Sequence, residues 1–152
     1  MKLVLYVFGK CKDKALLGHI AEYQKRLQRF WPLSIVELPP AHGSGTQVKE
    51  QEGALLLSKI SPDPLIVLDE TGSQFSSPAF AEKIGQFEDQ GAQALQFAIG
   101  GADGFSDAVR NRATLLLSLS KLTLPHMLVR PVLAEQLYRA ATIRSGHPYH
   151  RD

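Results

Sequence analysis

The sequence contains a single cysteine, Cys11, among its 152 residues, so no disulfide can form within the chain. One unpaired thiol fits a reducing compartment, and we expect a cytoplasmic protein. No apolar run approaches the ~20 residues that a membrane-spanning helix needs. The segment MKLVLYVFGK has one lysine before a very short apolar run and no small-residue cleavage site after it. It therefore predicts a first strand rather than a signal peptide.

Charge of one sign is also scarce, because the formal net charge is only +2. This balance argues against a global basic field of the kind that attracts nucleic acid. It does not exclude RNA as a substrate, since a local group of lysines and arginines can supply the attraction. Metal ligands are sparse as well: His147 and His150 are three residues apart, and Cys11 is remote from them. A structural zinc site usually needs four ligands, so we expect no metal.

Two common nucleotide-binding motifs are missing. No glycine is followed by the Lys-Ser/Thr pair of a Walker loop, and the segment GGADG (100–104) does not have the G-x-G-x-x-G spacing of the dinucleotide fingerprint. Asp103 within this segment would repel a pyrophosphate. The sequence thus disfavours a nucleotide-binding regulator. The glycines either form an ordinary tight turn or let the backbone approach a neutral or cationic nucleoside closely.

Apolar strands alternate with helical patterns along the chain, which predicts a single α/β domain over residues 1–152 with a mostly parallel sheet flanked by helices. The last helix begins near Pro125 or, alternatively, at Pro131; in the first case Pro131 should kink it. In a parallel sheet the ligand lies at the carboxyl ends of strands, so the loops after Leu68, Ile99 and Leu119 are the candidate site. The predicted strands are 3–8, 33–38, 65–68, 94–99 and 115–119, and the longer helices are 14–31, 48–60 and 77–90, the third with Ser77 as N-cap and Pro78 at its first position.

Four segments carry a resemblance to a known family: IGGADGF (99–105), LSLSKLTLPHMLVR (117–130), AEQLYRA (134–140) and HPYHRD (147–152). Together they closely resemble the bacterial RlmH proteins, which are small SPOUT-class methyltransferases that modify a pseudouridine of 23S ribosomal RNA. The resemblance extends over essentially the whole chain. The run from Ser118 to His126, together with the tail, is a specific match. Pro131 departs from the family pattern, which has an aliphatic residue there.

The resemblance implies an enzyme that uses S-adenosylmethionine to methylate N3 of pseudouridine 1915, on the assembled ribosome. It further implies a homodimer and a C-terminal trefoil knot, which the usual rule against knotted chains would not suggest. Two rival functions stay open: a related SPOUT enzyme with another RNA target, and a catalytically silent ribosome-binding protein. Carried over residue by residue, the methyl-donor site comprises Leu68, Gly100, Leu119, Ser120, Lys121, Leu122, Thr123 and Leu124.

Residues on the substrate side are predicted in two places. His126 either hydrogen-bonds or deprotonates the substrate, or is a helix-start histidine satisfied by backbone. A chain terminus is ordinarily frayed, but the resemblance implies an ordered tail in which Tyr149, His150 and Arg151 contact a flipped base. No carboxylate is a convincing general base; Asp69 and Glu70 are interpreted as solvated loop residues.

Overall fold

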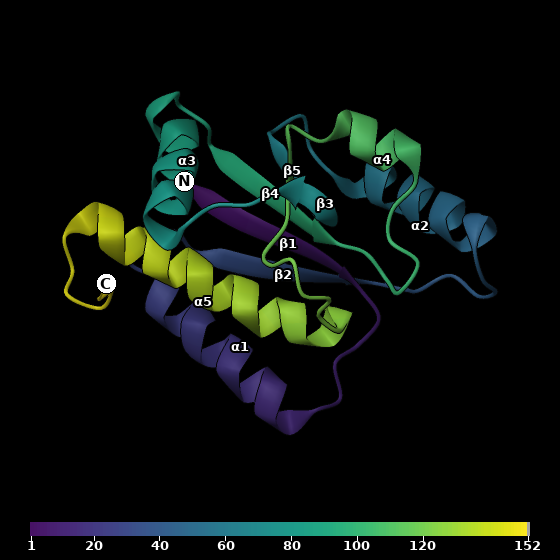
Figure 1. The fold of residues 1–152 in the computed structure, drawn as a ribbon, viewed down its shortest axis with the longest axis horizontal. Coiled ribbons are helices and arrows are strands. Elements are labelled where there is room, and N and C mark those ends of the chain that lie inside the picture. Colours follow the sequence, from purple (N-terminus) through teal and green to yellow (C-terminus); the bar gives the residue numbers. More distant parts are fainter. Residues whose placement is uncertain (152) are drawn as a thin grey trace.

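The computed structural model describes residues 1–151 and contains five strands and five helices in regular alternation (Figure 1). All strand pairs are parallel, and the strand order in the sheet is β2-β1-β4-β3-β5. This confirms the predicted α/β class and the parallel sheet. In chain order the elements are β1 Lys2–Phe8, α1 Lys14–Leu27, β2 Leu33–Leu38, α2 Thr46–Lys59, β3 Leu65–Ser73, α3 Ser77–Asp89, β4 Ala94–Ile99, α4 Asp107–Arg112, β5 Leu115–Leu117 and α5 His126–Ser145.

Strand β1 lies near the middle of the sheet and has apolar side chains on both faces, as a strand covered by helices on both sides requires. Leu3, Leu5 and Val7 point into one apolar core, whereas Tyr6 and Phe8 point into the other. This alternation follows from the two-residue period of a strand. The neighbouring strand β4 is buried along nearly its whole length, from Leu95 to Ile99.

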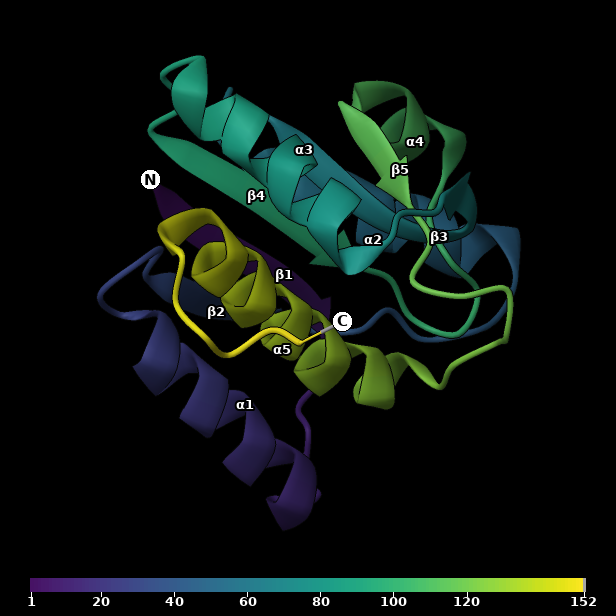
Figure 2. The same cartoon turned by 60° about the vertical axis from the view of Figure 1, so that its left-hand side comes forward.

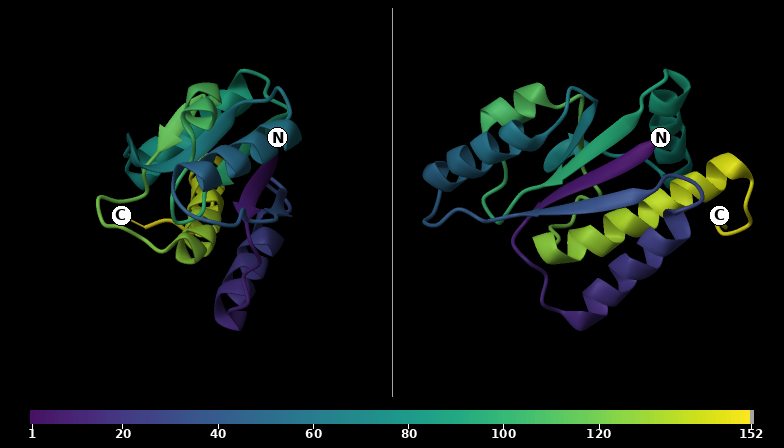
Figure 3. Two further views of the ribbon diagram at one scale, coloured as in Figure 1. Left: turned by 90° about the vertical axis from the view of Figure 1, so that its right-hand side faces the viewer. Right: turned by 180° about the vertical axis from the view of Figure 1, so that it is seen from behind.

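The two cores are covered by different helices (Figure 3). Helices α1, α3 and α5 cover the larger core, with α5 packed against both of the others. Helices α2 and α4 cover the smaller core through Leu56 and Val109. Figure 2 shows α5 lying alongside α1. After α5 the chain turns back, so that the tail runs beside α5.

Capping residues set the ends of several helices. Asp13 caps α1 by accepting hydrogen bonds from the amides of Ala15 and Leu16. The prediction for α3 was wrong by one residue: Ser76, not Ser77, is the N-cap, because its hydroxyl accepts from the amide of Ala79. Gly91 follows α3 with φ of +87°, which is the left-handed conformation expected of a glycine after a helix.

Two of the three strands that lead into the predicted site differ from their predicted bounds. Strand β5 ends at Leu117 rather than Leu119, whereas β3 continues past Leu68 to Ser73. Leu68 and Ser73 both pair with Leu117, so residues 69–72 bulge out of the ladder. Gly72 makes this possible, since a Cβ there would lie 2.6 Å from the carbonyl carbon and oxygen of Leu116.

Helix α5 begins at His126, so Pro131 lies within it and the alternative start at Pro131 was wrong. Pro131 is buried and has no amide hydrogen, which removes one helical hydrogen bond from the carbonyl of Met127. Gly146 ends the helix with φ of +74°, and the amide of His147 donates to the carbonyl of Thr142 at 3.0 Å. This glycine cap reverses the chain.

Candidate functional site

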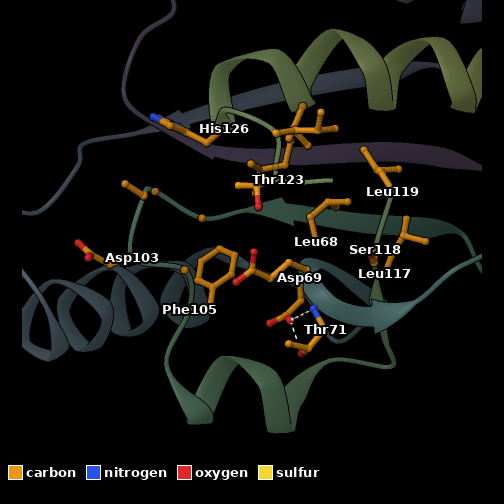
Figure 4. Close-up of a pocket in the computed structure, with 18 of the residues that line it drawn as sticks. Leu68, Asp69, Thr71, Asp103, Phe105, Leu117, Ser118, Leu119, Thr123 and His126 are labelled. Atoms are coloured by element: carbon orange, nitrogen blue, oxygen red, sulfur yellow. Dashed lines mark hydrogen bonds between the residues drawn. The ribbon is translucent and has the colours of Figure 1, made fainter. Parts of the chain in front are cut away.

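A cleft of about 650 Å³ lies at the carboxyl ends of the strands, where the three predicted loops meet. Its walls are residues 68–71 of β3, the glycine loop 99–105 and the segment 117–126. Lys49 of α2, Arg110 of α4 and Val129 of α5 complete it. Figure 4 shows Leu68 and Thr123 facing each other across this space. The structure therefore brings together loops that are up to about 50 residues apart in sequence.

The glycine loop is a compact turn whose backbone forms part of the cleft wall. The amide of Gly104 donates to the carbonyl of Gly101 at 3.0 Å. A Cβ at Gly100 would lie only 3.2 Å from the backbone of Gly104, so a larger residue would push the turn open. Gly104 itself has φ of +75°, which side chains rarely tolerate. Both glycines are therefore required by the turn itself.

The segment after β5 is held by side-chain-to-backbone hydrogen bonds. Ser118 donates its hydroxyl proton to the carbonyl of Ser120 at 2.9 Å, and the Ser120 hydroxyl accepts from the amide of Leu122 at 2.9 Å. These bonds present Leu122 at the cleft with 77% of its surface exposed. An apolar side chain so exposed beside a cleft is a natural contact for an apolar ring.

A carboxylate, a hydroxyl and a guanidinium are joined on the β3 side of the cleft. Asp69 accepts from the amide of Thr71 at 2.8 Å and from its hydroxyl at 2.5 Å, and forms an ion pair with Arg110. Burial raises the pKa of Asp69, but the bonds from Thr71 and Arg110 outweigh this and leave the pKa below its ordinary value. Asp69 is thus ionised at neutral pH and already engaged, which makes it a poor general base.

Beneath the glycine loop lies Glu52, whose residue surface is only 3% exposed. Its carboxylate accepts from the amide of Ala41 at 3.1 Å and lies 3.3 Å from the Cβ position of Gly101. Glu52 therefore joins the segment after β2 to the glycine loop. Its helical position alone indicates a solvated residue, and only the fold reveals this contact.

Arg130 holds the start of α5 against the end of β1. Its side chain is buried, one Nη atom donates to the carbonyl of Phe8 at 2.7 Å, and its Nε has no hydrogen-bond partner among the described residues. Burial lowers the pKa of Arg130, although Cys11 and Glu37 partly raise it. Almost none of Arg130 therefore reaches solvent in this chain.

His126 and the tail lie at different places along α5. His126 is the first residue of the helix and lines the cleft. The tail instead contacts the middle of α5. Tyr149 donates its hydroxyl proton to Glu135 at 3.0 Å, and His150 lies 3.0 Å from a nitrogen of Arg139. At ~1.5 Å per residue, His126 and Glu135 are separated by about 13 Å along the helix axis. Within one chain, none of residues 147–151 lines the cleft.

Comparison with known proteins decides the family. The family model described as "Predicted SPOUT methyltransferase" matches residues 1–150. The chain belongs to the SPOUT methyltransferases. Proteins named "Ribosomal RNA large subunit methyltransferase H" are 45% identical over 152 residues in Trichlorobacter lovleyi and 43% identical over 153 residues in Rhodospirillum centenum. Each alignment covers 99% of this chain and 99% of the relative, which confirms the resemblance drawn from the four sequence segments.

A solved structure is more distantly similar. The SpoU methyltransferase AviRb from Streptomyces viridochromogenes, in complex with the cofactor AdoMet, is 16% identical with a TM-score of 0.46, over 96% of this chain and 61% of that one.

Within this SPOUT methyltransferase, most of the expected donor-site residues line the cleft: Leu68, Gly100, Leu119, Ser120, Leu122, Thr123 and Leu124. Lys121 is exposed and is not among the lining residues. Arg151 is exposed at the end of the tail. The sequence prediction missed the ion pair of Asp69 and Arg110, which are 41 residues apart and have no shared motif. The buried ring of Phe105 also lines the cleft, although its apolar character alone indicates only a core residue.

Residues 1–151, which the structure describes, hold neither a cluster of metal ligands nor a helix able to span a membrane. No group of three or more histidines, cysteines, aspartates or glutamates is close enough to hold a metal ion in this part of the chain. None of its helices combines the length and the apolar character needed to cross a bilayer.

Proposed function

We propose that this SPOUT methyltransferase transfers the methyl group of S-adenosylmethionine to N3 of pseudouridine 1915 of 23S ribosomal RNA, in the cytoplasm and on the assembled ribosome. The relatives that share more than two fifths of its residues carry the name of a large-subunit ribosomal RNA methyltransferase. The observation that carries the proposal is the cleft itself. It joins the three loops that the family uses for its methyl donor, in a chain with no phosphate-binding motif.

The cleft has features that suit an adenosyl group. Leu119, Leu122 and Leu124 offer apolar surface for the adenine ring. The glycines of the loop have no Cβ, so the donor can approach their backbone atoms closely. Asp69 and Asp103 supply negative charge near a donor that carries a positive sulfonium. The donor itself supplies an activated methyl group, so the chain's residues need only position the acceptor and assist its loss of a proton.

His126 is the residue of the cleft best placed to act on the RNA. N3 of pseudouridine is a weakly acidic imide nitrogen, and a hydrogen-bond donor or cation nearby stabilises the anion that develops during transfer. Holding N3 in line with the methyl group can itself contribute ~7–11 kcal/mol of barrier reduction in favourable cases. We assign the substrate-side contact to His126 from within the chain and to Tyr149, His150 and Arg151 from the tail.

The position of the tail leads us to propose a homodimer with a shared site. Since Tyr149 and His150 lie about half the length of α5 from the cleft of their own chain, the tail would serve the cleft of a partner subunit. Leu17 of α1 and Leu128 of α5 are large apolar side chains that are 44% and 39% exposed, and an interface between two copies would cover such surface. We also propose the family's trefoil knot, formed where the segment 117–126 meets the glycine loop.

A heterodimer of two defective chains tests the shared site. One chain carries Gly100→Val, which blocks the donor cleft, and the other lacks residues 147–152. In a shared site the mixed dimer has one intact cleft served by one intact tail, so about half of the sites should be active. If each site is built within one chain, no activity returns. Homodimers of each variant give the residual activity against which the mixed dimer is compared, and separate affinity tags isolate the mixed species.

The RNA target is tested by mass spectrometry of 23S RNA fragments from cells with and without the gene. Loss of one methyl group from the fragment that contains pseudouridine 1915 supports the proposal. Loss at another nucleotide would assign a different RNA target to the same chemistry. An unchanged RNA, together with no calorimetric binding of S-adenosylmethionine, would identify a silent ribosome-binding protein and refute the enzyme.

A further inference from the structure

The tail is held in one conformation by a cluster centred on the carboxylate of Glu135, which we call the Glu135 cluster and which comprises Glu135, Tyr138, Arg139, Tyr149 and His150. Oε1 of Glu135 accepts from Nε of Arg139 at 3.0 Å, from Nη2 of Arg139 at 2.5 Å and from the hydroxyl of Tyr149 at 3.0 Å. A carboxylate that accepts two bonds from one guanidinium and one from a phenol has strong, directional partners. None of these bonds reaches the cleft.

The ring of Tyr149 is fixed as firmly as its hydroxyl. It packs edge-on against Tyr138, with ring centroids 4.6 Å apart and an interplanar angle of 64°. The guanidinium of Arg139 lies 5.0 Å from the centre of the same ring, within the range of a cation–π contact. The same guanidinium holds His150 through a contact of 3.0 Å to Nδ1. Arg139 therefore links the carboxylate to both tail residues.

The geometry before the tail supports the same conclusion. Gly146 adopts the left-handed conformation and directs the chain back along α5, and His147 packs edge-on against Phe30 with centroids 6.4 Å apart. Chain ends normally fray because few contacts hold them. Here the turn at Gly146, the edge-on contact of Tyr149 with Tyr138 and the carboxylate of Glu135 together hold residues 147–151. Burial, with Tyr23 and Glu135, also raises the pKa of Tyr149, so its hydroxyl keeps the proton that it donates.

From these contacts we infer that Glu135 is a positioning residue for methyl transfer, which sets the conformation of the tail before the RNA arrives. This inference depends on the proposed function, because the tail residues are assigned there to the substrate. Glu135 lies about half the length of α5 from the cleft of its own chain, and we infer that it acts on the shared site through Arg139 and Tyr149. Its removal should leave a free guanidinium and a frayed tail, while the donor cleft keeps its shape.

Glu135→Ala is the informative variant, and Glu82→Ala is its matched control, since Glu82 is exposed on α3 and makes none of these contacts. In Glu135→Ala we expect amide hydrogen exchange of residues 147–151 to be at least tenfold faster than in the wild type. We expect kcat/KM for ribosomes to fall at least tenfold, and the Kd for S-adenosylmethionine to stay within twofold. Glu82→Ala should match the wild type in all three measurements.

Two further variants separate positioning from a general loss of structure. Tyr149→Phe keeps the ring stack and loses only the hydroxyl bond to Glu135, so its loss of kcat/KM should be smaller than that of Glu135→Ala. Deleting residues 147–152 removes the element through which Glu135 is proposed to act. Adding Glu135→Ala to that deletion should therefore cause less than a twofold further loss.

Each outcome decides the question. The inference is overturned if Glu135→Ala leaves the amide exchange of the tail unchanged, or if the exchange becomes faster while kcat/KM stays the same. It is also overturned if Glu135→Ala lowers kcat/KM by the same factor in the chain without residues 147–152 as in the full chain. A parallel tenfold loss of donor affinity would assign Glu135 to the stability of α5 and would also overturn it. The proposed function fails separately, if the wild-type protein does not methylate ribosomes; the exchange measurement still reports whether Glu135 orders the tail.

Discussion

The same substitution, glycine to alanine, should have opposite effects at Gly72 and at Gly18. A Cβ at Gly72 would lie 2.6 Å from the carbonyl of Leu116 and 2.8 Å from the nitrogen of Leu117. These are backbone atoms of β5 and cannot swing aside as a long side chain can. A Cβ at Gly18, on the exposed side of α1, meets no atom within 4 Å.

The magnitudes follow from these two environments. Forcing an extra methyl group between packed backbones costs ~1–3 kcal/mol, so Gly72→Ala should lower the free energy of unfolding by about that amount. Gly18→Ala should raise it by ~0.8–1.0 kcal/mol, because alanine is the better residue within a helix. For a chain of this size, each kcal/mol corresponds to a shift of roughly 2–4 °C in Tm.

The assay is equilibrium unfolding in urea, followed by circular dichroism at one fixed protein concentration for the wild type and both variants. A fixed concentration is needed because the stability of an oligomer depends on it. Gly72 also closes the bulge that carries Leu68 and Asp69 into the cleft, so Gly72→Ala should weaken binding of S-adenosylmethionine as well. If Gly72→Ala unfolds at or above the urea concentration of the wild type, the close approach of β3 and β5 is refuted.

Three other variants test separate parts of the molecule. Leu122→Asn should weaken S-adenosylmethionine binding in calorimetry by about tenfold without lowering Tm, because Leu122 is 77% exposed and contributes little to the core; a lower Tm with unchanged affinity would contradict this. Asp69→Asn should be less stable than the wild type by ~1–3 kcal/mol at pH 7. The folded pKa of Asp69 is lowered, so the stabilisation by its carboxylate is complete above the unfolded pKa of ~3.9 and is lost as the pH falls through the folded pKa. In urea unfolding, the free energies of the wild type and of Asp69→Asn should therefore converge below about pH 4. A difference that stays constant with pH would exclude the carboxylate as the cause. Gln96→Met should lose ~2–4 kcal/mol, since the buried amide of Gln96 bonds to the backbone of Ser61 and Asp63; a neutral effect would contradict this and would indicate that the bonds from Arg112 to the same two carbonyls suffice.

The elements of this fold that depend on local sequence were predictable, and those that depend on distant partners were not. The continuous apolar run of β1 marked a strand that is buried on both faces and therefore needs apolar residues at nearly every position. The extension of β3 was not visible, because residues 69–73 are polar and pair only through a bulge opposite Leu117. Likewise β5 was predicted too long, since Ser118 and Leu119 continue the pattern of a strand while their backbone turns away into the cleft wall.

The candidate site shows the same division. The glycine loop and the segment 117–126 could be found because both signals, glycines for unusual backbone conformations and the family motif, lie in consecutive residues. The partners of Asp69 and of Glu135 could not be found in this way. Asp69 meets Arg110 only because β3 lies beside α4 in space, and Tyr149 meets Glu135 only because Gly146 turns the chain back.

The place of α5 in the larger core has a consequence for biosynthesis. Leu133, Leu137 and Ala141 fill the space between α1 and α3, yet they are synthesised after both of those helices. Until α5 has left the ribosome, the apolar faces of α1 and α3 have nothing to cover them, so this half of the molecule assembles only once α5 is available. A nascent chain stalled before His126 should consequently bind chaperones, whereas a chain that includes α5 should be released from them.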